Sequence, residues 1–215
     1  MRIEVENDAI RARKKQEYED LVSEMDAKGY EARIEKINIV TANVFAMVLF
    51  VIVGAITFGI NYTIRGNLFG DFFGGMNMYL WYLLFFVSYF LSIFVHEFIH
   101  GFFWHFPCEK KWGSIDFGLN VKMLTPYCHC REALNRKVYV FGAFAPTFFL
   151  GIIPIIIGLI INSYFVMFFG VIGFIGGAGD LMVIWTLRKH KDCMLFDHPY
   201  EVGYAYFVRK TGTEE

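Results

Sequence analysis

The chain has 215 residues, of which 56% are hydrophobic and 19% aromatic, and its formal net charge is −1. This composition is more apolar than that of a typical soluble domain, and the lack of a basic excess argues against nucleic acid as a partner. We therefore predict an all-α membrane protein in which the few charges are grouped between apolar stretches.

Residues 1–36 are predicted to form a cytoplasmic helical arm. Four apolar residues recur at helical spacing in this otherwise charged segment, namely Tyr18, Leu21, Val22 and Met25. Gly29 is well placed to end the helix. We expect the arm to lie on the membrane surface or on the rest of the protein, and we predict no chemistry for it.

A transmembrane core is predicted over residues 37–187. Four stretches in it carry almost no charge: Ile37–Tyr62, Met78–Trp104, Val138–Ile161 and Tyr164–Leu187. Each is long enough to cross an apolar layer of about 30 Å as a helix. The sequence thus predicts four transmembrane helices, of which the last two form an antiparallel hairpin because only Asn162 and Ser163 join them.

Lys and Arg are concentrated in the arm, in a loop at residues 105–137 and in a tail at residues 188–215. Because positively charged segments stay on the cytoplasmic side, we predict a multi-pass protein of the bacterial cell membrane with both termini in the cytoplasm. The first apolar stretch follows the charged arm, so a cleaved signal peptide is not expected. All four cysteines fall on the cytoplasmic side, where thiols stay reduced.

Short β-like segments are predicted in the loop and in the tail. Apolar and polar residues alternate over 115–121 and again over 204–208, which is typical of strands. These segments could pair with an extended substrate or pack as a cap over the cytoplasmic mouth. Pro146 and Pro154 are predicted to kink the third span.

The second span contains the motif H-E-x-x-H. His96 and His100 are four residues apart, so their rings project from one helical face and can bind one zinc ion, with Glu97 beside them as a general base. A haem is excluded because its two axial ligands approach from opposite faces. A proton or cation pathway is the main alternative, since transporters also place His and Glu in their spans.

A third zinc ligand is predicted at Asp180, an ionisable residue within the fourth stretch. Asp180 lies eight residues before Arg188, and His100 lies ten residues before Lys110. Both groups are therefore about 12–15 Å from the same membrane face. The preceding glycines, including a G-x-x-x-G pair at Gly173 and Gly177, allow close helix approach.

The predicted reaction is zinc-dependent hydrolysis of a peptide bond in a membrane-associated protein or peptide. Zinc held by His96, His100 and Asp180 lowers the pKa of a water molecule to about 7. Glu97 accepts the proton of that water and delivers it to the leaving nitrogen. The alternative is a catalytically inactive metal-binding protein, or a metal or proton transporter.

Several segments resemble the putative zincin peptidase family of small bacterial membrane proteins, which is similar to the site-two-protease class of intramembrane metalloproteases. They are HEFIHG from His96, TPYCHCREAL from Thr125, GAFAP from Gly142, GAGDL from Gly177 and DHPYEVGY from Asp197. The resemblance implies His96, His100 and Asp180 as zinc ligands and Glu97 as the catalytic carboxylate. Site-two proteases carry their aspartate in an L-D-G setting, whereas this chain has G-D-L.

Three further loop residues are weaker candidates: Cys128, His129 and Cys130. They could join Cys108 or Cys193 in a second metal site, or His129 could donate a hydrogen bond in the transition state. Because no C-x-x-C spacing is present, we interpret them as ordinary loop residues.

Overall fold

A computed structural model describes residues 2–5, 8–66, 73, 75–120, 125–197 and 203–210. Residues 1–39, 97–143 and 183–215 form one compact unit, here called the sheet unit, and residues 40–96 and 144–182 form a second, the helical unit. The elements are β1(Arg2–Val5), α1(Asp8–Ala27), β2(Tyr30–Lys36), α2(Ile39–Arg65), α3(Met78–Trp104), η1(Lys111–Ser114), β3(Ile115–Asn120), β4(Thr125–Cys130), β5(Leu134–Asn135), α4(Arg136–Pro146), the π-helix η2(Thr147–Ile152), α5(Ile153–Ile161), α6(Tyr164–Gly176), α7(Ala178–Leu187), β6(Met194–Asp197) and β7(Gly203–Arg209).

The sheet unit contains two small β-sheets. In the first, β3 lies between β1 and β4, parallel to β1 and antiparallel to β4. In the second, the order is β2-β7-β6-β5 and all neighbours are antiparallel. The predicted strands in the loop and the tail are confirmed over the described residues, while Val121 lies outside them. The predicted predominance of helices is confirmed, and within the described part of the chain the β structure extends beyond the predicted loop and tail to form two sheets.

The N-terminal arm is only partly helical. The predicted helix is α1, and it ends before Gly29, whose positive φ of 81° suits a glycine. The predicted apolar residues of α1 pack on the second sheet, and Tyr18 stacks on Phe196 with ring centroids 5.9 Å apart. The chain then continues as β2, which pairs along its whole length with β7 in the tail. A strand there was not predicted.

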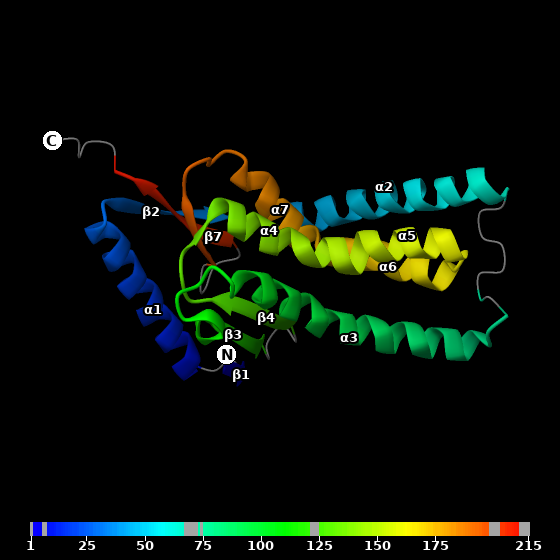
Figure 1. The fold of residues 1–215 in the computed structure, drawn as a ribbon, viewed down its shortest axis with the longest axis horizontal. Helices are drawn as coiled ribbons and strands as arrows, with labels where there is room; N and C mark the ends of the chain where they lie inside the picture. Colours follow the sequence, from blue (N-terminus) through cyan, green and yellow to red (C-terminus); the bar gives the residue numbers. More distant parts are fainter. Residues whose placement is uncertain are drawn as a thin grey trace. The chain divides into compact units, whose positions relative to one another are not determined.

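The helices of the helical unit carry apolar side chains on their exposed surfaces. Figure 1 shows these helices, coloured by their position in the sequence. Three helical segments are long and apolar enough to cross a membrane: α2, α3 and the continuous segment Arg136–Ile161 formed by α4, η2 and α5. On α2, large side chains such as Val44, Met47 and Val51 are more than half exposed. Such a surface in water would be far larger than a soluble monomer shows, so it fits a lipid environment.

The fourth apolar stretch is broken. It consists of α6 and α7, which pass the same length and composition test only as a pair and are bent by 45° at Gly177. Among the described residues, three helices are long and apolar enough to cross a membrane, or four if the bent pair counts as one span, and the count of four stays a prediction. The broken helix nevertheless places Asp180 in the first turn of α7.

The predicted hairpin of the last two apolar stretches is confirmed, and α5 and α6 lie side by side (Figure 1). Asn162 adopts the left-handed conformation with φ 57°, and the Ser163 side chain caps α6 by accepting a hydrogen bond from the backbone N–H of Val166 at 3.4 Å. The tight packing uses glycines, since a Cβ at Gly158 would lie 2.5 Å from the backbone nitrogen of Met167. Gly173 of the predicted pair faces the Leu150 carbonyl in η2. Its missing side chain therefore allows close packing within this hairpin.

Pro146 and Pro154 border an irregular segment of the third span. Pro146 ends α4, Pro154 lies at the start of α5, and the π-helix η2 fills the interval. π-helices are rare and occur mostly as short insertions in α-helices. The predicted kink stays a prediction, and the two prolines border a π-helical irregularity.

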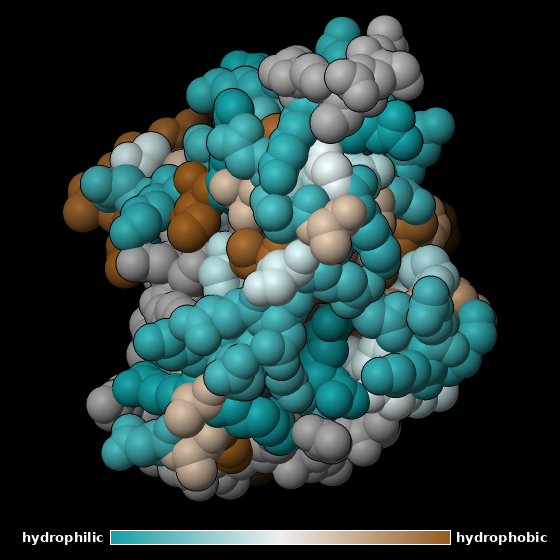
Figure 2. Space-filling view, turned by 90° about the vertical axis from the view of Figure 1, so that its left-hand side faces the viewer, coloured by the Kyte–Doolittle hydropathy of each residue, from teal (hydrophilic) through white to brown (hydrophobic). Residues whose placement is uncertain are grey.

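The surface of the sheet unit around α1 differs in character from the exposed surfaces of the helices in the helical unit. Figure 2 shows the face that carries α1, and it is mostly hydrophilic. Exposed Lys15–Glu19 and Lys28–Glu24 ion pairs follow one another along α1. This surface is of the kind that lies in water.

Candidate metal centre

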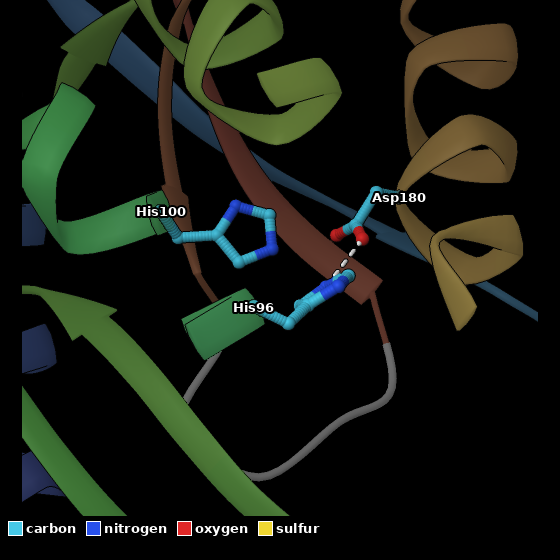
Figure 3. Close-up of side chains that lie close together, drawn as sticks. All are labelled: His96, His100 and Asp180. Carbon is cyan, nitrogen blue, oxygen red and sulfur yellow. Dashed lines mark hydrogen bonds and ion pairs between the residues drawn. The ribbon is translucent and has the colours of Figure 1, made fainter. Parts of the chain in front are cut away.

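The H-E-x-x-H motif lies on α3, which is one continuous helix. His96 and His100 are therefore one turn apart with their rings on the same side, as Figure 3 shows. His100 is buried, with 4% of its surface exposed, and His96 is largely buried. The sequence prediction that the two imidazoles share a helical face is confirmed.

Asp180 points toward these histidines from α7 (Figure 3). Its Oδ2 atom lies 3.1 Å from Nε2 of His96, which is hydrogen-bond distance. One ligand atom from each of His96, His100 and Asp180 lies within 4.8 Å of the other two. The structure therefore brings together the three residues that the sequence predicted as ligands, although they are as much as 84 positions apart.

The ring of His100 is fixed by two neighbours. Its Nδ1 lies 3.0 Å from the carbonyl oxygen of Gly142, and because a carbonyl only accepts, Nδ1 carries the hydrogen and Nε2 is left with a lone pair. The indole of Trp104 stacks on the ring at a centroid distance of 4.9 Å. Metal-binding histidines commonly donate their other N–H to a backbone carbonyl in this way.

Gly142 is necessary for this arrangement. A Cβ at this position would run into the indole of Trp104, so only glycine lets α4 approach α3 closely enough to present its carbonyl to His100. Trp104 also donates a hydrogen bond from Nε1 to the Tyr139 carbonyl at 3.3 Å. Sequence reasoning gave no role to Gly142 or Trp104; the motif GAFAP was the signal that pointed to the first.

The donor set fits zinc. Two imidazoles and one carboxylate are a usual set of three protein ligands in catalytic zinc sites, which keep a further position open. The hydrogen bond from His100 to Gly142 prepares that ring for the role. Within the described part of the chain, His96, His100 and Asp180 are the residues whose ligand atoms lie close enough together to hold a metal ion.

Glu97 follows His96 on α3 and lies on the side of β4. Its carboxylate contributes to raising the pKa of the Cys128 thiol well above the usual value, although burial of Cys128 is the larger cause. The β3–β4 hairpin packs closely here, since a Cβ at Gly101 would lie 2.5 Å from the ring of Phe117. The loop hairpin therefore lies directly against the motif turn of α3.

The weaker candidates Cys128, His129 and Cys130 do not join the cluster. His129 is buried in the sheet unit with its ring edge toward Phe196 at 5.1 Å, and burial lowers its pKa to about 3. His105 stacks on Trp112. None of the described cysteines joins a metal cluster. His198 lies outside the described residues.

The chain is similar to one known family over the residues of this site. No curated protein and no solved structure matches the chain. A family model described as "Putative zincin peptidase" matches residues 89–195, a range that contains the whole cluster and Glu97. Over these residues the chain is similar to that family, whose description implies zinc and a zincin-type metallopeptidase.

Proposed function

We propose that this protein is a zinc-dependent metallopeptidase of the membrane that hydrolyses peptide bonds in or near the bilayer. The observation that carries the proposal is the convergence of His96, His100 and Asp180 within 4.8 Å. Three ionisable groups in apolar helices are costly unless they are paired or functional. A bound divalent cation is the ligand that uses all three.

The roles of the residues follow from their chemistry. His96, His100 and Asp180 would hold the metal, and the Gly142 carbonyl keeps the His100 ring in position. A zinc ion bound there would supply Lewis acidity, polarising the scissile carbonyl and lowering the pKa of water. The Glu97 carboxylate accepts a proton from the attacking water and returns it to the leaving nitrogen.

The surroundings support a substrate that lies at the membrane. The site is built on two apolar helices, α3 and α7, and the β3–β4 hairpin lies against the motif turn of α3. We propose a membrane-associated protein or peptide as the substrate, with both chain termini on the cytoplasmic side. The packing of the hairpin on Gly101 favours the interpretation that it is a cap.

Zinc content and cleavage, measured together, test the proposal. Purified Glu97→Gln protein should retain zinc at the wild-type level by elemental analysis, because Glu97 is not a ligand. It should lose cleavage of a proteome-derived peptide library by at least about 100-fold, the usual scale for a lost general base. Asp180→Ala should lose zinc as well as cleavage.

Asp192→Ala is the matched control, since Asp192 is an exposed aspartate in the turn after α7. It should keep both zinc and cleavage. Full zinc occupancy in Asp180→Ala would remove Asp180 from the ligand set, and wild-type cleavage by Glu97→Gln would remove the proposed base. Zinc flux into vesicles without any peptide cleavage would favour a transporter.

A further inference from the structure

Two buried thiols meet near the C-terminal end of α3. Cys108 lies in the turn after this helix and Cys130 is the last residue of β4, and their Sγ atoms are 3.3 Å apart. Both are almost inaccessible, with 1% and 3% of their surfaces exposed. A disulfide has an S–S distance of about 2.05 Å, so closing the bond requires a movement of roughly 1.3 Å.

The pair is held by specific hydrogen bonds. The Cys108 thiol lies 3.2 Å from the Trp104 carbonyl, and the Cys130 thiol lies 3.5 Å from the Glu132 carbonyl. The contact between the sulfurs polarises them unequally: it lowers the pKa of Cys108 and raises the pKa of Cys130. Lys111 also contributes to lowering the pKa of Cys108. Because the Lys111 charge favours its thiolate, Cys108 is the sulfur that we expect to attack a disulfide.

A surface cavity lies beside the pair. It has a volume of about 510 Å³, which is within the usual range for small-molecule sites. Its lining includes Ser114, whose side chain hydrogen-bonds Cys108, and Glu132, whose carbonyl faces Cys130. The charged residues of the lining are five acids and three bases, namely Glu17, Asp20, Glu24, Glu109 and Glu132 with Lys28, Lys110 and Arg131. Ser114 and Glu132 therefore connect the cavity to the thiol pair.

We propose that Cys108 and Cys130 are a redox-active dithiol that a low-molecular-weight disulfide such as oxidised glutathione converts to an intramolecular disulfide. The inference is independent of the proposed peptidase activity. It concerns residues of the sheet unit that the metal centre does not use. In cytoplasmic proteins, disulfides are usually transient and redox-sensing.

The reaction is a pair of thiol–disulfide exchanges. The Cys108 thiolate attacks one sulfur of glutathione disulfide, whose S–S bond breaks and releases one glutathione thiolate, which takes up a proton. The Cys130 thiol then loses its proton and attacks Cys108 Sγ, releasing the second glutathione. Two protein thiols are oxidised, one glutathione disulfide is reduced to two thiols, and the charges balance.

Mass spectrometry of the full-length protein tests the proposal. Reduced protein in detergent is equilibrated with mixtures of glutathione and glutathione disulfide, then denatured and alkylated with N-ethylmaleimide. As the disulfide fraction rises, the number of alkylated cysteines should fall from four to two, and digestion should yield a peptide that links Cys108 to Cys130. Because both thiols are buried, the reaction should be slow.

Variants identify the attacking sulfur and the control position. Cys130→Ser should stop at a glutathione adduct on Cys108, and Cys108→Ser should form neither link nor adduct. Cys193→Ser should form the same link as the wild type, because the Cys193 thiol is directed to the His190 carbonyl. Four alkylated cysteines in the wild type at every glutathione ratio, or a link to Cys128 or Cys193, would overturn the proposal.

Discussion

His129 shows how strongly one buried side chain can tie stability to pH. It lies on β4, opposite Asp116 on β3, and is 5% exposed. Burial is the main cause that lowers its pKa to about 3, and Lys14, Arg131 and Arg13 add to the effect. The folded protein therefore keeps this imidazole neutral where the unfolded chain would protonate it.

This depressed pKa predicts acid sensitivity. As the pH falls below the unfolded-state pKa of 6.5, the unfolded chain binds a proton that the folded chain does not, so stability decreases until the pH reaches about 3. At pH 5 the free energy of unfolding is lower than at pH 7 by about 2 kcal/mol. Thermal unfolding followed by near-UV circular dichroism should show it between pH 7 and pH 5.

His129→Phe provides the comparison, because phenylalanine keeps a ring beside Phe196 and cannot titrate. Its melting temperature should change less than that of the wild type over the same pH range. Equal slopes for the two proteins would show that another group causes the acid sensitivity.

At the site, the sequence predicted which three residues cluster but not the residues that support them. The spacing of His96 and His100 is a local property of a helix, and Asp180 was detectable because a carboxylate is rare in an apolar stretch. Gly142 and Trp104 matter only because α4 crosses α3 at one point. Nothing local in their sequence encodes that crossing.

At the scale of elements, the α5–α6 hairpin depends on missing side chains. The nearest atoms to a Cβ at Gly158 belong to Met167, including its backbone nitrogen at 2.5 Å. Gly158→Leu should therefore force the helices apart and cost about 1–3 kcal/mol, the usual penalty for overpacking. Unfolding in mixed micelles with increasing sodium dodecyl sulfate measures this loss.

Gly59→Leu is a matched control for that change, because a Cβ at Gly59 on α2 would meet no described atom within 4 Å. It should leave the midpoint of unfolding within error of the wild type. An equal shift in both variants would mean that leucine perturbs any of these helices and that the hairpin contact is unimportant.

Two elements show where sequence patterns reached their limit. Residues 30–36 alternate in the manner of a strand, but β2 exists because β7, far away in the chain, pairs with all of it. Likewise, the composition of 164–187 predicted one continuous helix, whereas the chain bends at Gly177. Pairing and bending both depend on tertiary neighbours, which periodicity does not report.

At the scale of the whole molecule, folding should not require the metal. The His96–Asp180 hydrogen bond and the His100–Gly142 hydrogen bond give these side chains partners without an ion, and the core clusters of the sheet unit are made of apolar side chains. Protein treated with a chelator should keep its far-UV circular dichroism, in contrast to zinc fingers, which unfold without metal. Peptide cleavage should disappear and return when Zn²⁺ is added.

A loss of helical signal on chelation that reverses with zinc would show instead that the ion organises the fold. Excess Zn²⁺ should in any case raise the melting temperature by mass action, since it binds the folded state. Asp180→Ala should abolish this rise.

The hydrogen bond between His96 and Asp180 has a consequence for how the protein is made. A nascent chain that inserts into the membrane carries the Asp180 side chain into the apolar layer. The His96 imidazole can hydrogen-bond this carboxyl group before any metal ion binds. Biogenesis and activation can then be separate events. A newly inserted molecule would have no peptidase activity until it binds a metal ion.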